Sequence, residues 1–472
     1  MLFNSLAFLV FLPTVFLLYW FLLKENKGRN VLLLLASYLF YGWWDWRFLS
    51  LIIFSSLVDY LVGKRMAGED NEQRRKRLLF ISIFVNLGLL GFFKYFNFFI
   101  DSFINSFDFL GMNLNISTLY IILPVGISFY TFQTMSYTID LYKQEIKPCN
   151  DPLAFFTFVA FFPQLVAGPI ERASHLLPQF YKKRNFDYTQ AVSGLRLILW
   201  GMFKKIVIAD RLAEYVNIIY SDPAAHTGLP VILGTIFFAF QIYCDFSGYS
   251  DIAIGTARLF GFDLMTNFRT PYFSKTIKEF WSRWHISLST WFRDYVYIPL
   301  GGNRASTSRW ITNLMITFVV SGFWHGANWT FVIWGAIHGI VNGIEALNSK
   351  FQLLKFRLPT ILQVMLTFTI VCFAWIFFRA NSFGDAILII QNAVDFSNGL
   401  SNVKIISAFD LAILLLLVGF LISTELISQS DNTVEKLLKN QTVRYISYIT
   451  LILLIVFFGV FQNKQDFIYF QF

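Results

Sequence analysis

The chain of 472 residues is 56% hydrophobic and only 14% charged, with a mean hydropathy of +0.56. These values exclude an ordinary soluble globular protein and are typical of a polytopic membrane protein. The net charge of +9 does not indicate nucleic acid, because the lysines and arginines gather in short connectors between apolar runs, and the protein is expected to contact lipid instead.

Apolar runs recur along the whole chain. The first 23 residues carry no charge, but they lack a basic leading segment and a small-residue cleavage site, so they are interpreted as a retained membrane helix. Further runs lie at 31–44, 48–62, 78–93, 110–139, 229–243, 311–344, 359–378, 411–424 and 445–462. We predict an all-α fold with about 10–12 transmembrane helices, and no repeat or soluble segment divides the single membrane domain expected over 1–472.

The connectors alternate in charge, which predicts the topology. Lys24–Arg29 and Lys64–Arg77 are basic, whereas Asp101–Thr118 holds two Asp and no cation. Basic connectors remain in the cytoplasm, so we expect Asp101–Thr118 outside and a multi-pass protein of the cell inner membrane.

For two stretches the sequence does not determine how deeply they lie in the membrane. Residues 153–170 are apolar but contain Pro163 and Pro169 and are flanked by cations, which favours a re-entrant or in-plane segment over a crossing. Residues 196–211 form an apolar pattern that Lys204 and Lys205 interrupt. That helix spans only if the two lysines snorkel or face a cavity.

A basic aromatic block, residues 269–309, precedes the longest uncharged run. It interleaves tryptophans and tyrosines with Lys and Arg, as an interfacial helix on the cytoplasmic side does. His285 lies within this block, where it has two interpretations: a partner in proton transfer, or an aromatic-belt residue that hydrogen-bonds lipid headgroups.

The run 311–344 contains the strongest candidate for an active centre. One straight helix of this length would overshoot a hydrocarbon core of about 30 Å, so we expect a break at SGFWHGANW, where Gly326 and Asn328 weaken the helix. The break contains His325, flanked by Trp324 and Trp329. An intramembrane histidine indicates a functional site, and the alternative is a packing histidine.

Other polar groups lie near this run. His338 follows within the same run, and Asp245 and Asp251 end an upstream apolar run, where Arg258, His285 or a substrate could pair with them or where they hold helices together. No HExxH motif, cysteine pair or carboxylate at helical spacing accompanies the histidines, so no metal is expected.

Several motifs in order resemble the membrane-bound O-acyltransferase family, in its bacterial branch typified by the membrane subunit of alginate O-acetylation. The motifs cover nearly the whole chain and are FQTMSYTIDLYK (132–143), FFPQLVAGPIER (161–172), YCDFSGYSDIAIG (243–255), FWSRWHISLSTWFRDYVYIPLGGNR (280–304), SGFWHGANW (321–329), WGAIHG (334–339) and FAWIFFRA (373–380).

The resemblance implies an enzyme that moves an acyl group from a thioester donor to a hydroxyl, with helices around a central cavity. By resemblance, His325 is the catalytic histidine and His285 the second key polar residue. We predict that substrate contacts come from a wider set: Trp324, Asn328, Trp329, Asp245, Asp251, Arg283, Arg293 and His338.

We expect no bound cofactor and a cytoplasmic acyl thioester, most simply acetyl-CoA, docked against the basic aromatic block, although lipid binding by its cations is the alternative. The acceptor is expected to be an extracytoplasmic polysaccharide, or an exported hydrolase-like acetyltransferase as partner. The alternatives within the family are D-alanyl transfer and peptidoglycan O-acetylation. Outside it they are a proton-coupled transporter and a non-catalytic scaffold.

Overall fold

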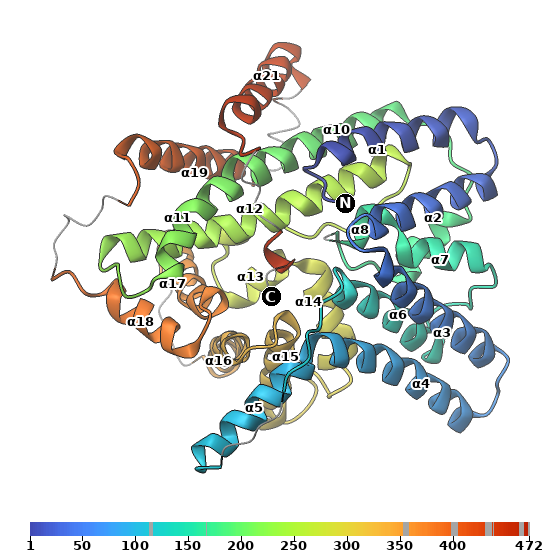
Figure 1. Cartoon of the computed structure of the whole chain (residues 1–472), viewed down its shortest axis with the longest axis horizontal. Helices are drawn as coiled ribbons and strands as arrows, with labels where there is room; N and C mark the ends of the chain where they lie inside the picture. The colour runs from blue at the N-terminus through green and yellow to red at the C-terminus, as the bar shows by residue number, and fades with distance from the viewer. Residues whose placement is uncertain are drawn as a thin grey trace. The chain divides into compact units, whose positions relative to one another are not determined.

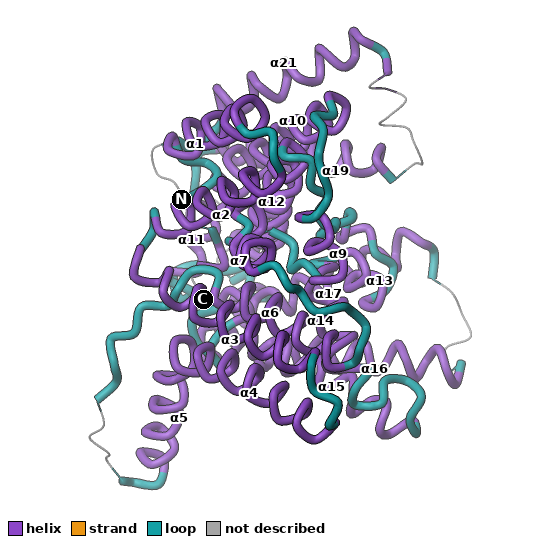
Figure 2. Tube along the Cα trace, turned by 90° about the vertical axis from the view of Figure 1, so that its right-hand side faces the viewer, coloured by secondary structure: helices purple, strands orange, loops and turns teal. Residues whose placement is uncertain are grey.

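The computed structural model describes residues 1–112, 117–166, 168–352, 358–397, 405–429, 437, 439–461 and 467–470. Within these ranges every regular element is a helix (Figure 1, Figure 2). A helix satisfies its own backbone hydrogen bonds, which lipid cannot do, so apolar runs of this kind fold as helices. The predicted all-α fold is confirmed.

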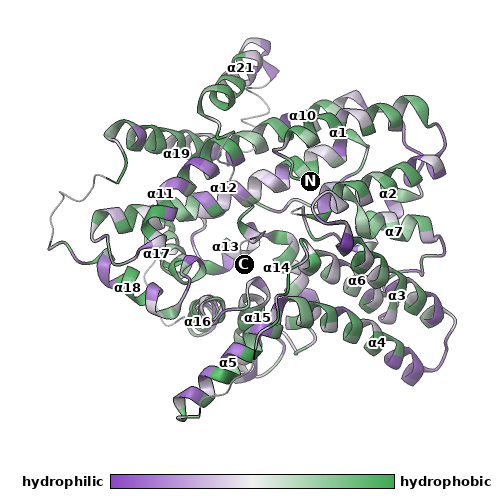
Figure 3. Ribbon diagram, viewed as in Figure 1, coloured by the Kyte–Doolittle hydropathy of each residue, from purple (hydrophilic) through white to green (hydrophobic). Residues whose placement is uncertain are grey.

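Several helices are suited to cross a membrane, and Figure 3 shows mostly hydrophobic residues along them. In the described part of the chain, seven are long and apolar enough to do so: Trp46–Ala67, Glu72–Asp108, Leu229–Leu259, Trp329–Phe351, Thr360–Arg379, Ala408–Ser428 and Gln441–Phe458. Two shorter apolar helices are Leu6–Leu22 and Pro152–Leu165. The protein is a multi-pass membrane protein, while the count of ten to twelve crossings stays a prediction.

The chain packs as two compact units, unit 1 (Met1–Ile198 and Ile252–Met265) and unit 2 (Leu199–Asp251 and Thr266–Phe472). Unit 1 contains α1 (Leu6–Leu17), α2 (Asn26–Gly42), α3 (Leu49–Ala67), α4 (Glu72–Leu90), α5 (Phe96–Phe109), α6 (Ile127–Tyr142), α7 (Pro152–Ala160), α8 (Phe162–Leu165), α9 (Ala173–Leu176) and most of α10 (Tyr188–Met202). Unit 2 contains α11 (Asp210–Ser221), most of α12 (Leu229–Leu259), α13 (Ile277–Arg283), α14 (Ile286–Phe292), α15 (Thr307–His325), α16 (Trp329–Phe351), α17 (Thr360–Arg379), α18 (Phe383–Ala393), α19 (Ala408–Ser428) and α21 (Gln441–Phe458).

In unit 1 a buried carboxylate joins three helices. Asp59 of α3 is fully buried and accepts hydrogen bonds from Ser82 (2.5 Å) and Asn86 (2.8 Å) of α4. Thr138 of α6 shares a hydrogen bond of 2.9 Å with Ser82. Polar side chains thus connect α3, α4 and α6 in place of apolar packing.

The apolar run 110–139 is only partly helical, because α6 begins at Ile127, after Gly126 adopts a left-handed φ of +76°. The segment 153–170 forms two short helices, α7 and α8, that meet at Phe161. Together they span roughly 20 Å, less than a hydrocarbon core of about 30 Å, which fits the predicted segment that does not cross. Its depth in a membrane stays a prediction.

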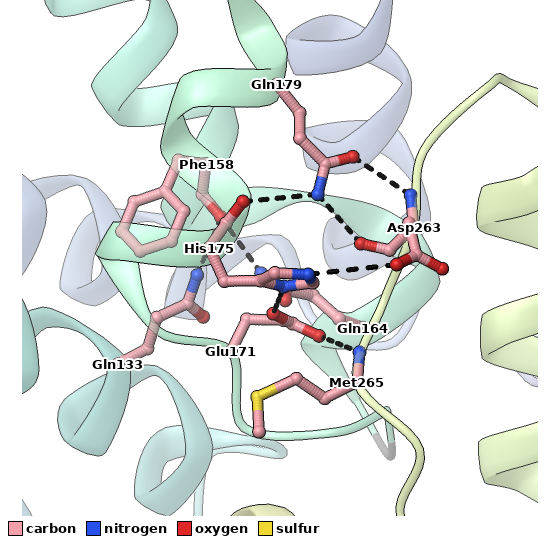
Figure 4. A network of polar contacts seen from close by, with 8 residues as sticks. All are labelled: Gln133, Phe158, Gln164, Glu171, His175, Gln179, Asp263 and Met265. Carbon is pink, nitrogen blue, oxygen red and sulfur yellow. Dashed lines mark hydrogen bonds and ion pairs between the residues drawn. The ribbon is translucent and has the colours of Figure 1, made fainter.

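The stretch that follows α8 is fixed by a polar network (Figure 4). The fully buried Glu171 accepts a hydrogen bond from the backbone N–H of Met265 (2.5 Å), and its other oxygen lies 2.7 Å from His175 Nδ1. Gln179 and Asp263 exchange two further hydrogen bonds through side-chain amide and backbone. The hydrogen bond that His175 donates to Glu171 raises the pKa of His175.

In unit 2 the run 311–344 breaks as predicted. The first helix, α15, ends at His325, Gly326 is extended, and the second helix, α16, begins at Trp329, after the Asn328 side chain accepts a hydrogen bond from the Thr330 N–H. The two helices pack closely as a hairpin, since a Cβ atom built on Gly322 would lie 2.2 Å from the Phe331 carbonyl oxygen.

Lys204 and Lys205, which interrupt the apolar pattern of 196–211, occupy a π-helical turn (Phe203–Ala209) between α10 and α11. Each is buried and paired. Lys204 Nζ lies 2.7 Å from Asp251, and Lys205 Nζ lies 2.7 Å from Asp245 and 2.8 Å from Asp210. These pairs compensate the cost of burying the lysines, so the helix needs no snorkelling to accommodate them.

Candidate active site

The imidazole of His325 ends α15 in an aromatic enclosure. Only 2% of its surface is exposed. Its ring centroid lies 4.9 Å from Trp324, 5.0 Å from Trp334 and 5.5 Å each from Phe378 and Tyr469. A base in such surroundings is shielded from bulk water, as a group that handles a hydrolysable thioester must be.

His285 lies at the junction of α13 and α14, fully buried, in a left-handed conformation with φ +43°. Its Nδ1 lies 3.1 Å from Asn267 Oδ1. The Ser287 backbone N–H donates to the same Asn267 atom, which identifies that atom as the oxygen, so Nδ1 carries the proton and Nε2 the lone pair. Burial lowers the pKa of His285 to about 3, which keeps the ring neutral near pH 7.

The structure brings the two histidines to one place, although they come from different helices. Trp324 and Tyr469 each contact both rings: the centroids of Trp324 and Tyr469 lie 6.4 and 6.5 Å from His285, and closer to His325. The interpretation of His285 as a lipid-facing belt residue is wrong, because the ring has no exposed surface. Trp281, Trp284 and Trp291 of the same block are also buried.

A pocket of about 860 Å³ opens among α13, α14, α15 and α16. Apolar rings of Trp281, Phe292 and Trp310 line it, together with the cations Lys278 and Arg293. Ser321 of α15 also lines it and lies one helical turn before His325, so both residues face the same side of that helix. The wall of the pocket therefore comes within one helical turn of His325.

Two predicted substrate contacts are placed elsewhere. Trp329 does not flank His325 but is 57% exposed at the start of α16. Asn328 caps that helix and donates a hydrogen bond to the Asn381 carbonyl (2.9 Å). Contact of these two residues with substrate stays a prediction.

The two predicted arginines differ. Arg293 lines the pocket, with its Nε 2.7 Å from Asp294. Arg283 is absent from the pocket lining and pairs with Glu279 at 2.6 Å, one turn earlier on α13. Lys278, another cation of the basic aromatic block, lines the pocket in its place.

Asp245 forms an ion pair with Lys205, and Asp251 forms one with Lys204. The partners of these two ion pairs are therefore lysines, and not Arg258 or His285 as the sequence suggested. His338 is fully buried behind Trp334 and accepts a hydrogen bond of 3.4 Å from Trp281 Nε1. It supports the tryptophans between pocket and enclosure. No group of three or more His, Cys, Asp or Glu side chains that could hold a metal occurs in the described ranges.

Sequence reasoning missed two residues of this site, Asn267 and Tyr469. Asn267 is buried in a loop, and no spacing or motif distinguishes it. Tyr469 belongs to the closing stretch NKQDFIYFQF, whose four aromatic residues after four polar ones were the available signal. Tyr469 lies more than 140 residues from either histidine in sequence, and only the fold brings it to them.

Comparison with known proteins places this geometry in a family. The model of MBOAT, the membrane-bound O-acyltransferase family, matches residues 38–384. The probable alginate O-acetylase AlgI of Pseudomonas aeruginosa is 42% identical over 387 residues, covering 81% of this chain and 72% of that protein. The peptidoglycan O-acetyltransferase of Helicobacter pylori is 37% identical over 432 residues, covering 85% and 81%.

A more distant relative, the teichoic acid D-alanyltransferase of Bacillus subtilis, is 30% identical over 278 residues, covering 55% of this chain and 69% of that protein. These relatives are named as acyl-transferring enzymes, which sets aside the transporter and scaffold alternatives. With the family model matched over most of its length, the chain belongs to the membrane-bound O-acyltransferase family and is a membrane enzyme that transfers acyl groups.

Proposed function

We propose that the enzyme transfers an acetyl group from cytoplasmic acetyl-CoA to a hydroxyl that serves an extracytoplasmic polysaccharide, with His325 as general base. The observation that carries this proposal is the position of His325: it ends α15 inside the aromatic enclosure, one turn beyond Ser321 of the large pocket. A base so placed reaches a thioester that enters through the pocket.

The pocket suits the donor in size and charge. Its volume of about 860 Å³ is within the range of cofactor-sized sites. Lys278 and Arg293 at its wall can pair with the phosphates of coenzyme A, while the aromatic wall accommodates the pantetheine arm.

In the transfer step, a hydroxyl attacks the thioester carbonyl as His325 takes its proton. The tetrahedral intermediate then collapses, and the thiol of coenzyme A leaves with that proton. His285 has its lone pair on Nε2, because Nδ1–H donates to Asn267. This tautomer accepts a hydrogen bond, so His285 orients the attacking hydroxyl and does not stabilise an oxyanion.

Tyr469 is a candidate for that hydroxyl. Its ring contacts both imidazoles, and its buried hydroxyl has no hydrogen-bond partner among the described residues. Acetylation of Tyr469 would give an ester on the protein. A second hydroxyl, outside the membrane, would then attack the acetyl carbonyl and release Tyr469 with its hydroxyl restored. Such a relay would explain how one site accepts an acetyl group from a cytoplasmic donor and passes it to an acceptor on the other side of the membrane.

The names of the relatives refer to alginate, peptidoglycan and teichoic acid, which supports a polysaccharide as the final acceptor here. We propose an exported hydrolase-like acetyltransferase as the partner that carries the acetyl group to the polysaccharide. Such a division of labour requires a location in the cell inner membrane, with donor and acceptor on opposite faces.

The test compares two buried histidines of the same hairpin. His325→Gln should lower acetylation of surface polysaccharide by at least about 10²-fold with unchanged protein yield, since general base catalysis contributes about that much. His338→Gln should retain measurable transfer, because an amide oxygen can still accept the Trp281 N–H. Wild-type acetylation in His325→Gln would disprove the assignment.

The relay is tested by Tyr469→Phe, which keeps the ring and removes the hydroxyl. A relay predicts loss of transfer, and in the wild-type protein an acetyl-sized mass increase on the peptide that contains Tyr469. Full transfer in Tyr469→Phe would show that the base acts directly on the external acceptor.

The donor site is tested in nanodiscs of neutral lipid. Lys278→Gln and Arg293→Gln should raise the KM for acetyl-CoA with a smaller effect on kcat. Arg283→Gln is the matched control, because this arginine pairs with Glu279 outside the pocket lining. An equal effect of all three substitutions would assign the cations to the lipid surface.

A further inference from the structure

The segment Phe467–Phe470 carries Tyr469 into the active site and is deeply seated there. Phe467 and Ile468 have 0% and 1% of their surface exposed. The ring of Phe246 on α12 lies 5.6 Å from Phe467 and 4.7 Å from Tyr469. Aromatic packing of this kind holds a segment in place but does not fix its register along the chain.

A single carboxylate supplies a directional contact. The backbone N–H of Ile468 donates a 2.7 Å hydrogen bond to Asp245 Oδ2. The other oxygen of Asp245 lies 2.7 Å from Lys205 Nζ, and Lys205 lies 2.8 Å from Asp210. Asp245, Lys205 and Asp210 each have at most 3% of their surface exposed. The lysine compensates the buried charge, which leaves one oxygen of Asp245 to receive the Ile468 N–H.

The neighbouring acidic residue shows that this arrangement is specific. Asp251 lies six residues further along α12 and pairs with Lys204 at 2.7 Å, next to Lys205 in the π-helical turn. The two pairs are alike in chemistry, but it is Asp245 that accepts the hydrogen bond from the backbone N–H of Ile468. Asp245 and Asp251 look alike in the sequence, but their contacts in the structure differ.

We infer that Asp245 is a positioning residue for acyl transfer: braced by Lys205 and Asp210, it fixes the segment Phe467–Phe470 so that Tyr469 stands beside His325 and His285. This inference rests on the proposed role of Tyr469 in the reaction. It assigns Asp245 no contact with substrate.

The first experiment measures seating without catalysis. A cysteine placed at Phe467 should resist a membrane-permeable maleimide, as should the three native cysteines, which are buried. Adding Asp245→Ala should raise the labelling rate on the order of tenfold or more, since a hydrogen bond to a charged acceptor is equivalent to about that factor in an opening equilibrium. Asp251→Ala, the matched control, should leave the cysteine protected.

The second experiment measures turnover. Asp245→Ala should lower kcat at saturating acetyl-CoA by about tenfold or more with little change in the KM for the donor, because no residue of the segment lines the pocket. Asp245→Asn, which keeps an oxygen for the Ile468 N–H, should restore part of both protection and kcat.

Two outcomes would overturn the inference: a cysteine at Phe467 that is labelled even with Asp245 intact, or equal labelling in the Asp245→Ala and Asp251→Ala variants. Because labelling needs no donor, these outcomes are separate from failure of the proposed reaction. If Tyr469→Phe were fully active while Asp245→Ala released the segment, Asp245 would still be shown to hold the segment in place, but the relay through Tyr469 would be disproved.

Discussion

Close approach of α15 and α16 is predicted to set the position of His325, and Gly322→Ala tests this. A Cβ at Gly322 would lie 2.2 Å from the Phe331 carbonyl oxygen, whereas ordinary contacts begin at 3.4 Å. The hairpin must therefore open by roughly 1 Å, close to the residue that ends α15. Overpacking of this kind costs about 1–3 kcal/mol, and a displacement of about 1 Å in a catalytic group can cost about 10²-fold in rate.

The assay is acetyl transfer together with the thermal unfolding midpoint in one detergent. Gly343→Ala is the matched control in the same hairpin, because its Cβ would meet Ile311 at 3.7 Å, an ordinary contact. We expect Gly322→Ala to lose both stability and rate, and Gly343→Ala to change neither by much. If both variants transferred acetyl groups and unfolded alike, close helix approach would not be what positions the imidazole.

Three further predictions follow from local contacts. Glu171→Gln should lower the pKa of His175, measured by NMR of labelled histidine, because their hydrogen bond is the main cause of its rise; the stability that this raised pKa contributes is present at low pH and lost as pH rises through it. An unchanged pKa would contradict this. Asn267→Ala should slow transfer about tenfold or more by freeing His285, and a wild-type rate would refute it. Single cysteines within Lys64–Arg77 should react only with reagents that reach the cytoplasm, and outside labelling would overturn the topology.

Structural features that depend only on residues close together in the sequence could be predicted from the sequence. The break at Gly326 follows from the length of an uncharged run and from weak helix formers at its centre, both visible in one stretch of chain. Residues 153–170 form short helices because Pro163 and its surroundings cannot continue a long one. Patterns of this range also identified the family, whose motifs are local strings.

Burial of the basic aromatic block could not be predicted in the same way. Tryptophan beside arginine is typical of a membrane interface and also of a helix with one buried face. In the structure Trp284 and Trp291 are buried while Arg293 is mostly exposed, so the alternation separates an inner face from an outer one. Because composition is identical in both cases, only the packing of α13 and α14 against neighbouring helices distinguishes them.

Contacts between residues distant in sequence could not be predicted, and in this protein such contacts lie at the candidate active site. An acidic residue in an apolar run indicates that some partner exists, but it does not say which. Asp245 is paired with Lys205, about one helix and a loop earlier, and with Ile468, more than 200 residues later. Each contact is unremarkable alone. Together they connect the π-helical turn to Tyr469 and hence to both imidazoles, so we infer that Asp245, which sequence analysis placed at the substrate, acts on the geometry of the reacting residues.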